Sequence, residues 1–500
     1  PGFFFFFKQL FGQTAVYGLG TIVPRLLNYL LVPLYTRIFA DDQYGIITEL
    51  YAYVAFLLVL LTYGMETSFF RYAEKEKDPI RVFSTSLFSL LSTSLLFIAV
   101  VIILLDPIST AIKYGQNQEY ILLFAIIVAV DAFAAIPFAW LRQQNRALRF
   151  SVIKIINVAV NIGLNLYFLV LCPAVATKNP DSILLFAYDE TIGVGYVFIA
   201  NLVSSIVTLL LLVPQILRIR PVLDMQLLRR MLGYAFPLLV IGLAGMTNEV
   251  SDKIIFKYLA TVPEGISNGE EYIMGQLGIY GANYKLAVMM TLFIQMFRYA
   301  AEPFFFAQAK EENSKEVYAQ VMKYFFIFGM AIFLGVTLFI DVFKYFIGPD
   351  YWEGLFIVPI VLLANLFLGI FYNLSVWYKL NDITRYGAFI ALAGALITIV
   401  MNVALVPSMG YAGAAWAHFA CYLSMVVMSF FLGRRFFRID YPLLRIGLYL
   451  IIGLILYFIF RLTDLEAGPL RYVLSFILMA VFLLVAYMLE RREVGKMNKE

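Results

Sequence analysis

Two basic residues lie deep inside apolar stretches of the sequence, where little water is available to solvate a charge. Arg25 interrupts "GLGTIVPRLLNYLLVPLYTRIF" (18–39), and Lys285 interrupts an apolar run over 272–298. At ~1.5 Å of rise per residue, each cation would lie roughly 20 Å into a spanning helix, beyond the reach of a side chain to either interface. A charge at this depth needs a carboxylate partner or a wet cavity. The sequence leaves both alternatives open for both residues.

The chemistry that suits two such cations in one cavity is phosphate binding. Arginine offers a fixed fork of donors and lysine a mobile point charge, and both bind phosphate well. Together Arg25 and Lys285 would suit a bridging pyrophosphate.

The helix that carries Arg25 also contains Pro24. Proline lacks a backbone donor and crowds the carbonyl four residues earlier, so a bend or an opening is expected there.

A polar stripe follows one face of the helix predicted over 149–172. Its members are spaced i, i+3, i+7 and i+11, which places them on one side of a helix; they are Lys154, Asn157, Asn161 and Asn165. Amides in membranes usually hydrogen-bond between helices, but they also donate to and accept from sugar hydroxyls. The stripe is therefore either structural or a sugar-contacting wall, and Lys154 is shallow enough to reach the cytoplasmic interface.

A third group of charges provides candidates for ion coupling or gating. They are Glu49, Glu66, Asp131, Glu249, Asp252, Lys253, Arg71, Arg298 and Glu302. The deep carboxylates at 49, 66 and 131 would serve Na⁺ or proton coupling, or pair with Arg25. Glu249 and Lys253 have the spacing of an intrahelical ion pair, and Arg71, Arg298 and Glu302 would latch a cytoplasmic gate or form solvated helix ends. His418, the single histidine, is a packing residue or a proton relay.

The elements that must position these residues are membrane helices. Of the 500 residues, 62% are hydrophobic and 14% charged, whereas soluble domains are roughly 45–50% apolar and about 25% charged. Stretches of about 20 apolar residues are long enough to span a bilayer. They occur near 12–38, 43–70, 82–105, 118–141, 149–172, 190–216, 231–258, 272–298, 317–341, 353–379, 384–406, 411–433, 442–461 and 469–490. The sequence thus predicts an all-α integral membrane protein with about 14 transmembrane helices.

The basic residues set the orientation of these spans. Lysine and arginine gather in alternate connections and in the basic tail, and far fewer lie in the connections between. Because cytoplasmic loops collect these residues, both termini are predicted to be cytoplasmic.

The connections between the predicted spans are short, and the sequence has neither a nucleotide-binding G-x-x-x-x-G-K-[ST] loop nor metal-ligand spacing. We therefore expect no enzyme, no cofactor, no metal and no nucleic-acid partner. A glycan polymerase or glycosyltransferase would need a larger catalytic loop.

An internal duplication organises the spans. "YGIITELYAY" (44–53) aligns with "LGIYGANYKL" (277–286), and "NIGLNLYFLVLCP" with "GVGYVFIAN" resembles "NVALVPSMGYAGAAWAHFA" (402–420). Both pairs lie six helices apart, which indicates a parallel repeat of two six-helix lobes. The expected division is 1–216 for the first lobe, 217–440 for the second, and 441–500 for two further helices and a tail.

The stretches "PRLLNYLLVPLYTRIFADDQYG" and "NVALVPSMGYAGAAWA" resemble the polysaccharide-transport branch, with its Wzx-type flippases, of the multidrug/oligosaccharidyl-lipid/polysaccharide (MOP) exporter superfamily. The resemblance implies two pseudo-symmetric bundles around a cavity that opens alternately to each side. It implies a monomer in the bacterial inner membrane that moves a polyprenyl-pyrophosphate-linked oligosaccharide to the outer leaflet. The alternatives are a cation-coupled drug antiporter of the same superfamily and a lipid II flippase.

Overall fold

The computed structural model describes residues 22–218, 220, 223–309, 311–381, 383–463 and 465–497, without the side chains at 299, 300, 302, 303, 306, 307 and 492–497. Every regular element in this part of the chain is helical, as predicted. The α-helices are α2 (Val32–Ile38), α3 (Asp41–Thr62), α4 (Met65–Lys75), α5 (Pro79–Ile103), α6 (Leu105–Ala111), α7 (Gln118–Gln143), α8 (Ala147–Leu166), α9 (Cys172–Ala176), α10 (Gly195–Ile216), α11 (Met225–Leu259), α12 (Gly269–Leu286), α13 (Val288–Gln308), α14 (Ser314–Leu338), α15 (Ile340–Phe343), α16 (Val358–Leu374), α17 (Val376–Leu380), α18 (Arg385–Met409), α19 (Tyr411–Phe436), α20 (Leu443–Leu462) and α21 (Pro469–Met497).

Membrane spans account for most of these helices. Within the described ranges, 12 helices are long and apolar enough to cross a bilayer, and 13 if the bent pair α12 and α13 forms one span. These 13 coincide in order with the second to fourteenth predicted spans. The predicted first span, 12–38, lies partly outside the described residues, so the count of 14 stays a prediction.

The first predicted helix is interrupted where it is described. Residues 22–29 are helical, Leu30 and Leu31 form a turn, and α2 begins at Val32 with Pro33 in its first turn. Pro33 has no N–H to donate to the carbonyl of Tyr29, and its ring crowds that carbonyl. This explains the break. The break expected at Pro24 cannot be compared, because the residues before 22 lie outside the described part.

The chain divides into two compact units. Unit 1 comprises 1–39 and 47–250, and unit 2 comprises 40–46 and 251–500. The predicted division at 216 and 440 stays a prediction. In unit 1, α7 packs against both α5 and α10, and α10 packs against α8. A core of aromatic and aliphatic side chains, including Phe69, Phe83 and Trp140, joins α4, α5 and α7.

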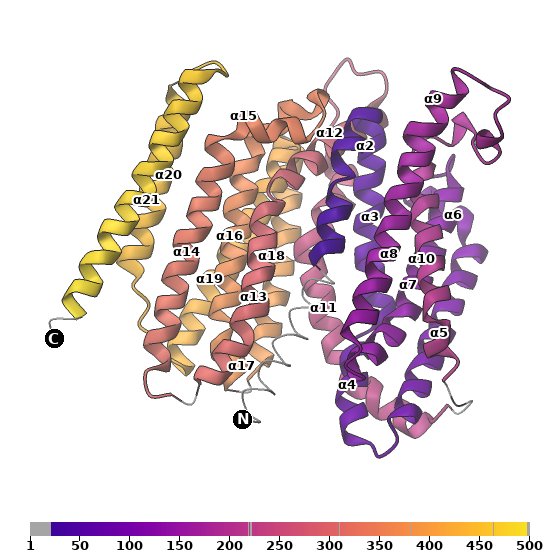
Figure 1. Cartoon of the computed structure of the whole chain (residues 1–500), viewed down its shortest axis with the longest axis horizontal. Coiled ribbons are helices and arrows are strands. Elements are labelled where there is room, and N and C mark those ends of the chain that lie inside the picture. Colours follow the sequence, from indigo (N-terminus) through magenta and orange to yellow (C-terminus); the bar gives the residue numbers. More distant parts are fainter. Residues whose placement is uncertain are drawn as a thin grey trace. The chain divides into compact units, whose positions relative to one another are not determined.

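In unit 2, α19 packs against α16 and α18, while α14 packs against α16, α20 and α21. Figure 1 shows α20 and α21 running side by side as an antiparallel pair. Ion pairs fasten this pair to α14 at one end and to α15 near the other. Lys323 Nζ lies 2.6 Å from Glu490 Oε2 at one end, and Arg471 Nε lies 2.7 Å from Asp341 Oδ2 near the other.

A close backbone crossing joins the start of α3 to α12 within unit 2. A Cβ added to Gly45 would lie 2.0 Å from the carbonyl oxygen of Met274, and one added to Gly278 would lie 1.9 Å from that of Asp41. Only glycine fits at either position, since no side-chain carbon can approach a backbone oxygen so closely.

Candidate functional site

Arg25 and Lys285 occupy comparable settings in the two units. Arg25 lies in the helical segment 22–29, one turn before the break at Leu30, and its side chain is exposed. Lys285 lies in the last turn of α12, also exposed, where the chain bends by 47° into α13. Both cations therefore stand beside an interruption in a helix, Arg25 in the predicted first span and Lys285 in the bent pair α12 and α13. Interrupted helices of this kind are where transporters present charge and backbone groups to a cargo.

Further charges of unit 1 surround Lys154 on α8. Lys154 experiences the charges of Asp131 on α7, Glu66 on α4 and Arg25. Its ammonium also lies 4.1 Å from the centroid of the Phe138 ring. Asp131 is hydrogen-bonded to Ser205 on α10. The sequence-predicted residues 25, 66, 131 and 154 thus belong to one electrostatic group in unit 1.

The two glutamates considered as partners of Arg25 have other described partners. Glu66 Oε1 lies 2.6 Å from Arg142 Nη1, a pair that is nearly half exposed on both sides. Glu49 is fully buried and accepts a hydrogen bond of 2.7 Å from the hydroxyl of Tyr114.

The asparagines of the stripe on α8 make hydrogen bonds to neighbouring helices. Asn157 Nδ2 donates to Thr208 Oγ1 at 2.9 Å and to the carbonyl of Ser204 at 3.0 Å, both on α10. Asn161 Nδ2 donates to Asn28 Oδ1 at 3.1 Å.

Asn165 is fully buried and accepts from the hydroxyl of Tyr35 at 2.9 Å. Immediately beyond it, α8 widens into a π-helical turn, Tyr167–Leu171, a feature often found at functional sites. The stripe thus connects α8 to α10, to α2 and to the helical segment before the break. The amide donors used in these contacts are not available to sugar hydroxyls in this arrangement.

A buried polar network lies in unit 2 on α11, α12 and α19. Asp252 is 1% exposed, forms an ion pair with Lys253 at 3.0 Å, and accepts a hydrogen bond of 2.5 Å from the hydroxyl of Tyr280. The Lys253 ammonium lies 4.2 Å from the centroid of the Tyr284 ring, and the hydroxyl of Tyr284 meets His418 Nε2 at 3.1 Å. These contacts form a continuous polar path from α11 through α12 to α19.

The sequence did not single out Tyr280 and Tyr284 as members of this path. Tyrosines are frequent in this chain, which contains 33. The available signal was their i, i+4 spacing on the helix that carries Lys285, which places both rings on one face.

The remaining candidates lie on α4, α11 and α13. The Arg71 guanidinium lies 4.1 Å over the ring of Tyr234 at the start of α11. Glu249 on α11 is exposed. Arg298 lies on α13, 3.9 Å over the ring of Tyr372. Glu302 lies on the same helix, but its side chain is outside the described part of the chain. Among the described residues, no group of three or more His, Cys, Asp or Glu could hold a metal ion.

Comparison with known proteins identifies a family and a fold for this chain. Residues 10–309 match the family model described as "Polysaccharide biosynthesis protein". No curated protein sequence matches the chain.

Among solved structures, a lipid II flippase MurJ in an inward closed conformation has a TM-score of 0.67 at 14% identity, covering 95% of this chain and 99% of that one. A multidrug resistance MATE family transporter of the MOP superfamily, in an outward-facing conformation, has a TM-score of 0.56 at 14% identity, covering 86% and 95%. A MATE protein in a straight conformation scores 0.59 at 14% identity with the same coverage. At these identities the likeness shows the fold.

Proposed function

The chain belongs to the polysaccharide biosynthesis protein family of the MOP exporter superfamily, and from this premise we propose that it is a flippase for a polyprenyl-pyrophosphate-linked oligosaccharide. It would carry the glycan from the inner to the outer leaflet of the bacterial inner membrane, acting as a monomer with both termini in the cytoplasm. It is a transporter in this proposal, with no catalytic step.

The observation that carries the proposal is the exposure of Arg25 within the predicted first membrane segment. A guanidinium cannot lose its charge at an accessible pH. The two glutamates nearest in sequence bind Arg142 and Tyr114, so an anionic cargo is a suitable partner. Each phosphate of a pyrophosphate offers pairs of oxygen atoms that can accept two parallel hydrogen bonds from the donor fork of arginine.

Lys285 would supply the second cation. Its position in the last turn of α12 favours a positive charge, because the carbonyl groups at a helix C-terminus carry partial negative charge. Its mobile ammonium can follow a phosphate as the cavity changes shape. The sugars would be contacted by polar groups of α8 if part of the asparagine network opens during transport.

The Asp252 network is our candidate for ion coupling. The carboxylate of Asp252 is almost completely buried beside Lys253 and Tyr280. Binding or release of Na⁺ or a proton at such a carboxylate would change the strength of its contacts with α12. Glu49, Glu66, Asp131 and Glu249 remain further coupling candidates, and Arg71, Arg298 and Glu302 remain gating candidates.

Replacement of Arg25 tests the proposal. In liposomes containing the purified protein and a labelled polyprenyl-pyrophosphate oligosaccharide, Arg25→Ala should lower the flipping rate at least about tenfold, the effect expected from loss of a charge-assisted hydrogen bond. Arg37→Ala is the matched control, because Arg37 is an exposed arginine on α2 that donates to the carbonyl of Pro33. Arg37→Ala should flip at the wild-type rate.

Unchanged transport by folded Arg25→Ala would refute the cargo role of Arg25. The same assay separates the alternatives. Transport of lipid II in preference to the oligosaccharide carrier would identify a lipid II flippase, and exchange of organic cations for Na⁺ or protons would identify a drug antiporter. The two midplane cations argue against the antiporter, because they would repel a cationic drug.

A further inference from the structure

An open pocket lies in unit 2 between α13 and the pair α16 and α17. Its volume is about 390 Å³, including its mouth. It is lined by Phe297, Arg298, Ala301, Phe305, Tyr372, Ser375, Val376, Lys379 and Leu380. None of these nine described residues is acidic, and two are cationic.

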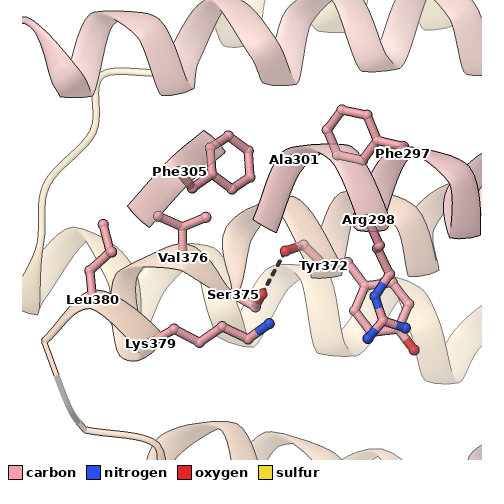
Figure 2. A pocket seen from close by; sticks show the side chains of 9 residues that line it. All are labelled: Phe297, Arg298, Ala301, Phe305, Tyr372, Ser375, Val376, Lys379 and Leu380. Carbon is pink, nitrogen blue, oxygen red and sulfur yellow. Dashed lines mark hydrogen bonds between the residues drawn. The ribbon is translucent and has the colours of Figure 1, made fainter. Parts of the chain in front are cut away.

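The two cations occupy the polar side of the pocket. The guanidinium of Arg298 lies flat against Tyr372, 3.9 Å from the ring centroid, which restricts its motion and leaves its edge for hydrogen bonding. Figure 2 shows Arg298 extending down from α13 over the Tyr372 ring and the Lys379 ammonium reaching toward Ser375. The Ser375 hydroxyl donates to the carbonyl of Tyr372 at 2.6 Å, so the backbone between the two cations is fixed.

The opposite side of the pocket is apolar and firmly packed. Ala301, Phe305 and Val376 belong to a buried cluster that also contains Tyr318. The hydroxyl of Tyr318 donates to the carbonyl of Phe305 at 2.8 Å, which holds the wall in place. A ligand that fits both sides has an anionic head and an apolar tail.

The position of the pocket along the membrane helices supports this assignment. Lys379 and Arg385 lie on a connection that the distribution of positive charge predicts to be cytoplasmic, and Lys315 lies at the start of α14 on the same side. Phosphate headgroups of the inner leaflet occupy this level, and basic pockets between membrane helices on the cytoplasmic side bind them.

We propose that this pocket binds the phosphate headgroup of an anionic amphiphile, with the phosphate on Arg298 and Lys379 and the start of the tail against Phe297 and Phe305. Two sources supply that chemistry: a bilayer phospholipid, or a polyprenyl pyrophosphate arriving as cargo. The inference is independent of Arg25, because unit 2 alone provides the site. It also gives Arg298 a binding role in place of the gating role considered from the sequence.

A binding measurement on the full-length protein in neutral detergent tests the proposal. The probes are short-chain phosphatidylglycerol, farnesyl pyrophosphate and short-chain phosphatidylcholine. The wild type should bind one or both anionic probes more tightly than the zwitterionic one. The double variant Arg298→Gln/Lys379→Gln should lose about tenfold or more of that affinity, as expected for removal of charge-assisted hydrogen bonds.

Arg385→Gln is the matched control. Arg385 is an exposed arginine of unit 2 that follows α17 and lies near the ring of Tyr386. It does not line the pocket. It should bind as the wild type does. Arg298→Lys/Lys379→Arg keeps both charges and should retain most of the affinity, which separates loss of charge from loss of folding.

The outcome with the two anionic probes identifies the source of the ligand. Preference for phosphatidylglycerol supports a phospholipid site, and preference for the pyrophosphate supports an entry site for cargo. Failure of both probes to bind, or equal losses in the double variant and in Arg385→Gln, would overturn the proposal. Arg25→Ala should bind both probes normally even where it no longer flips cargo, so failure here is distinguishable from failure of the proposed function.

Discussion

Individual residues show how costly an uncompensated charge is in this protein. Asp252 and Lys253 form an ion pair in which the side chains are 1% and 11% exposed. Removal of one partner of a buried pair leaves the other charge with less compensation and typically costs about 3–5 kcal/mol. Asp252→Asn should therefore lower the free energy of unfolding in detergent by an amount in this range.

The surface pair Arg438–Asp440 provides the matched control for Asp252→Asn. Its side chains are 64% and 81% exposed, and exposed pairs contribute about 0–1 kcal/mol. Asp440→Asn should leave the unfolding transition nearly unchanged. Equal effects of the two substitutions would show that burial does not strengthen the Asp252–Lys253 pair.

The sequence predicted which candidate residues share a helix face, but it did not predict the residues that they contact. The helical period placed Asn157, Asn161 and Asn165 on one face. Nothing local indicated that Asn161 would meet Asn28, or that Asn165 would meet Tyr35, 130 residues away. Such partners depend on which helices pack together and at what height, and a single-helix period contains neither quantity.

At the scale of the element, the start of α11 depends on one aspartate. The carboxylate of Asp224 accepts from the backbone N–H groups of Gln226 and Leu227 at 3.0 Å each and pairs with Arg81 on α5. The N–H of Leu227 and the charge of Arg81 lower the pKa of Asp224 from its ordinary value of 3.8, partly offset by desolvation. The charged form therefore stabilises the folded state.

Because the folded-state pKa is lowered, the stabilisation is complete above the ordinary pKa and is lost as pH falls through the folded value. We expect Asp224→Asn, which keeps a capping oxygen but has no charge, to melt at a lower temperature than the wild type at pH 7. The difference should shrink below about pH 3.8. Melting curves of both proteins across this range measure it, and a difference that stays constant down to the lowest pH would exclude the charge as its cause.

The crossing of α3 and α12 predicts opposite effects for two glycine substitutions. An added Cβ at Gly278 would lie 1.9 Å from the carbonyl oxygen of Asp41, whereas at Gly447 on α20 it would meet nothing within 4 Å. Gly278→Ala should destabilise the protein by about 1–3 kcal/mol through overpacking. Gly447→Ala should be neutral or stabilising by up to about 1 kcal/mol, because alanine is the better helix former. Thermal unfolding of both variants in the same detergent compares them, and equal shifts would contradict the close crossing.

At the scale of the whole molecule, the helical membrane fold was predictable because lipid imposes a simple rule on sequence. Every spanning backbone must satisfy its own hydrogen bonds, so long apolar runs become helices. The runs at 118–141 and 411–433 correspond closely to α7 (Gln118–Gln143) and α19 (Tyr411–Phe436). Interruptions were harder to predict. The 47° bend after Lys285 occurs within an apolar run that contains no proline to mark it.

The orientation of the whole chain can be tested with two engineered cysteines. Lys178 lies on a connection predicted to face outward, and Arg385 on one predicted to face the cytoplasm; both residues are exposed. The native cysteines, Cys172 and Cys421, are free and fully buried, so a membrane-impermeant maleimide should leave the wild type unlabelled. In intact bacterial cells expressing the protein, Lys178→Cys should be labelled, whereas Arg385→Cys should be labelled only after permeabilisation. The reverse pattern would place the termini outside the cell, and the pocket beside Lys379 would then face the outer leaflet and could not serve as an entry site for cargo from the cytoplasm.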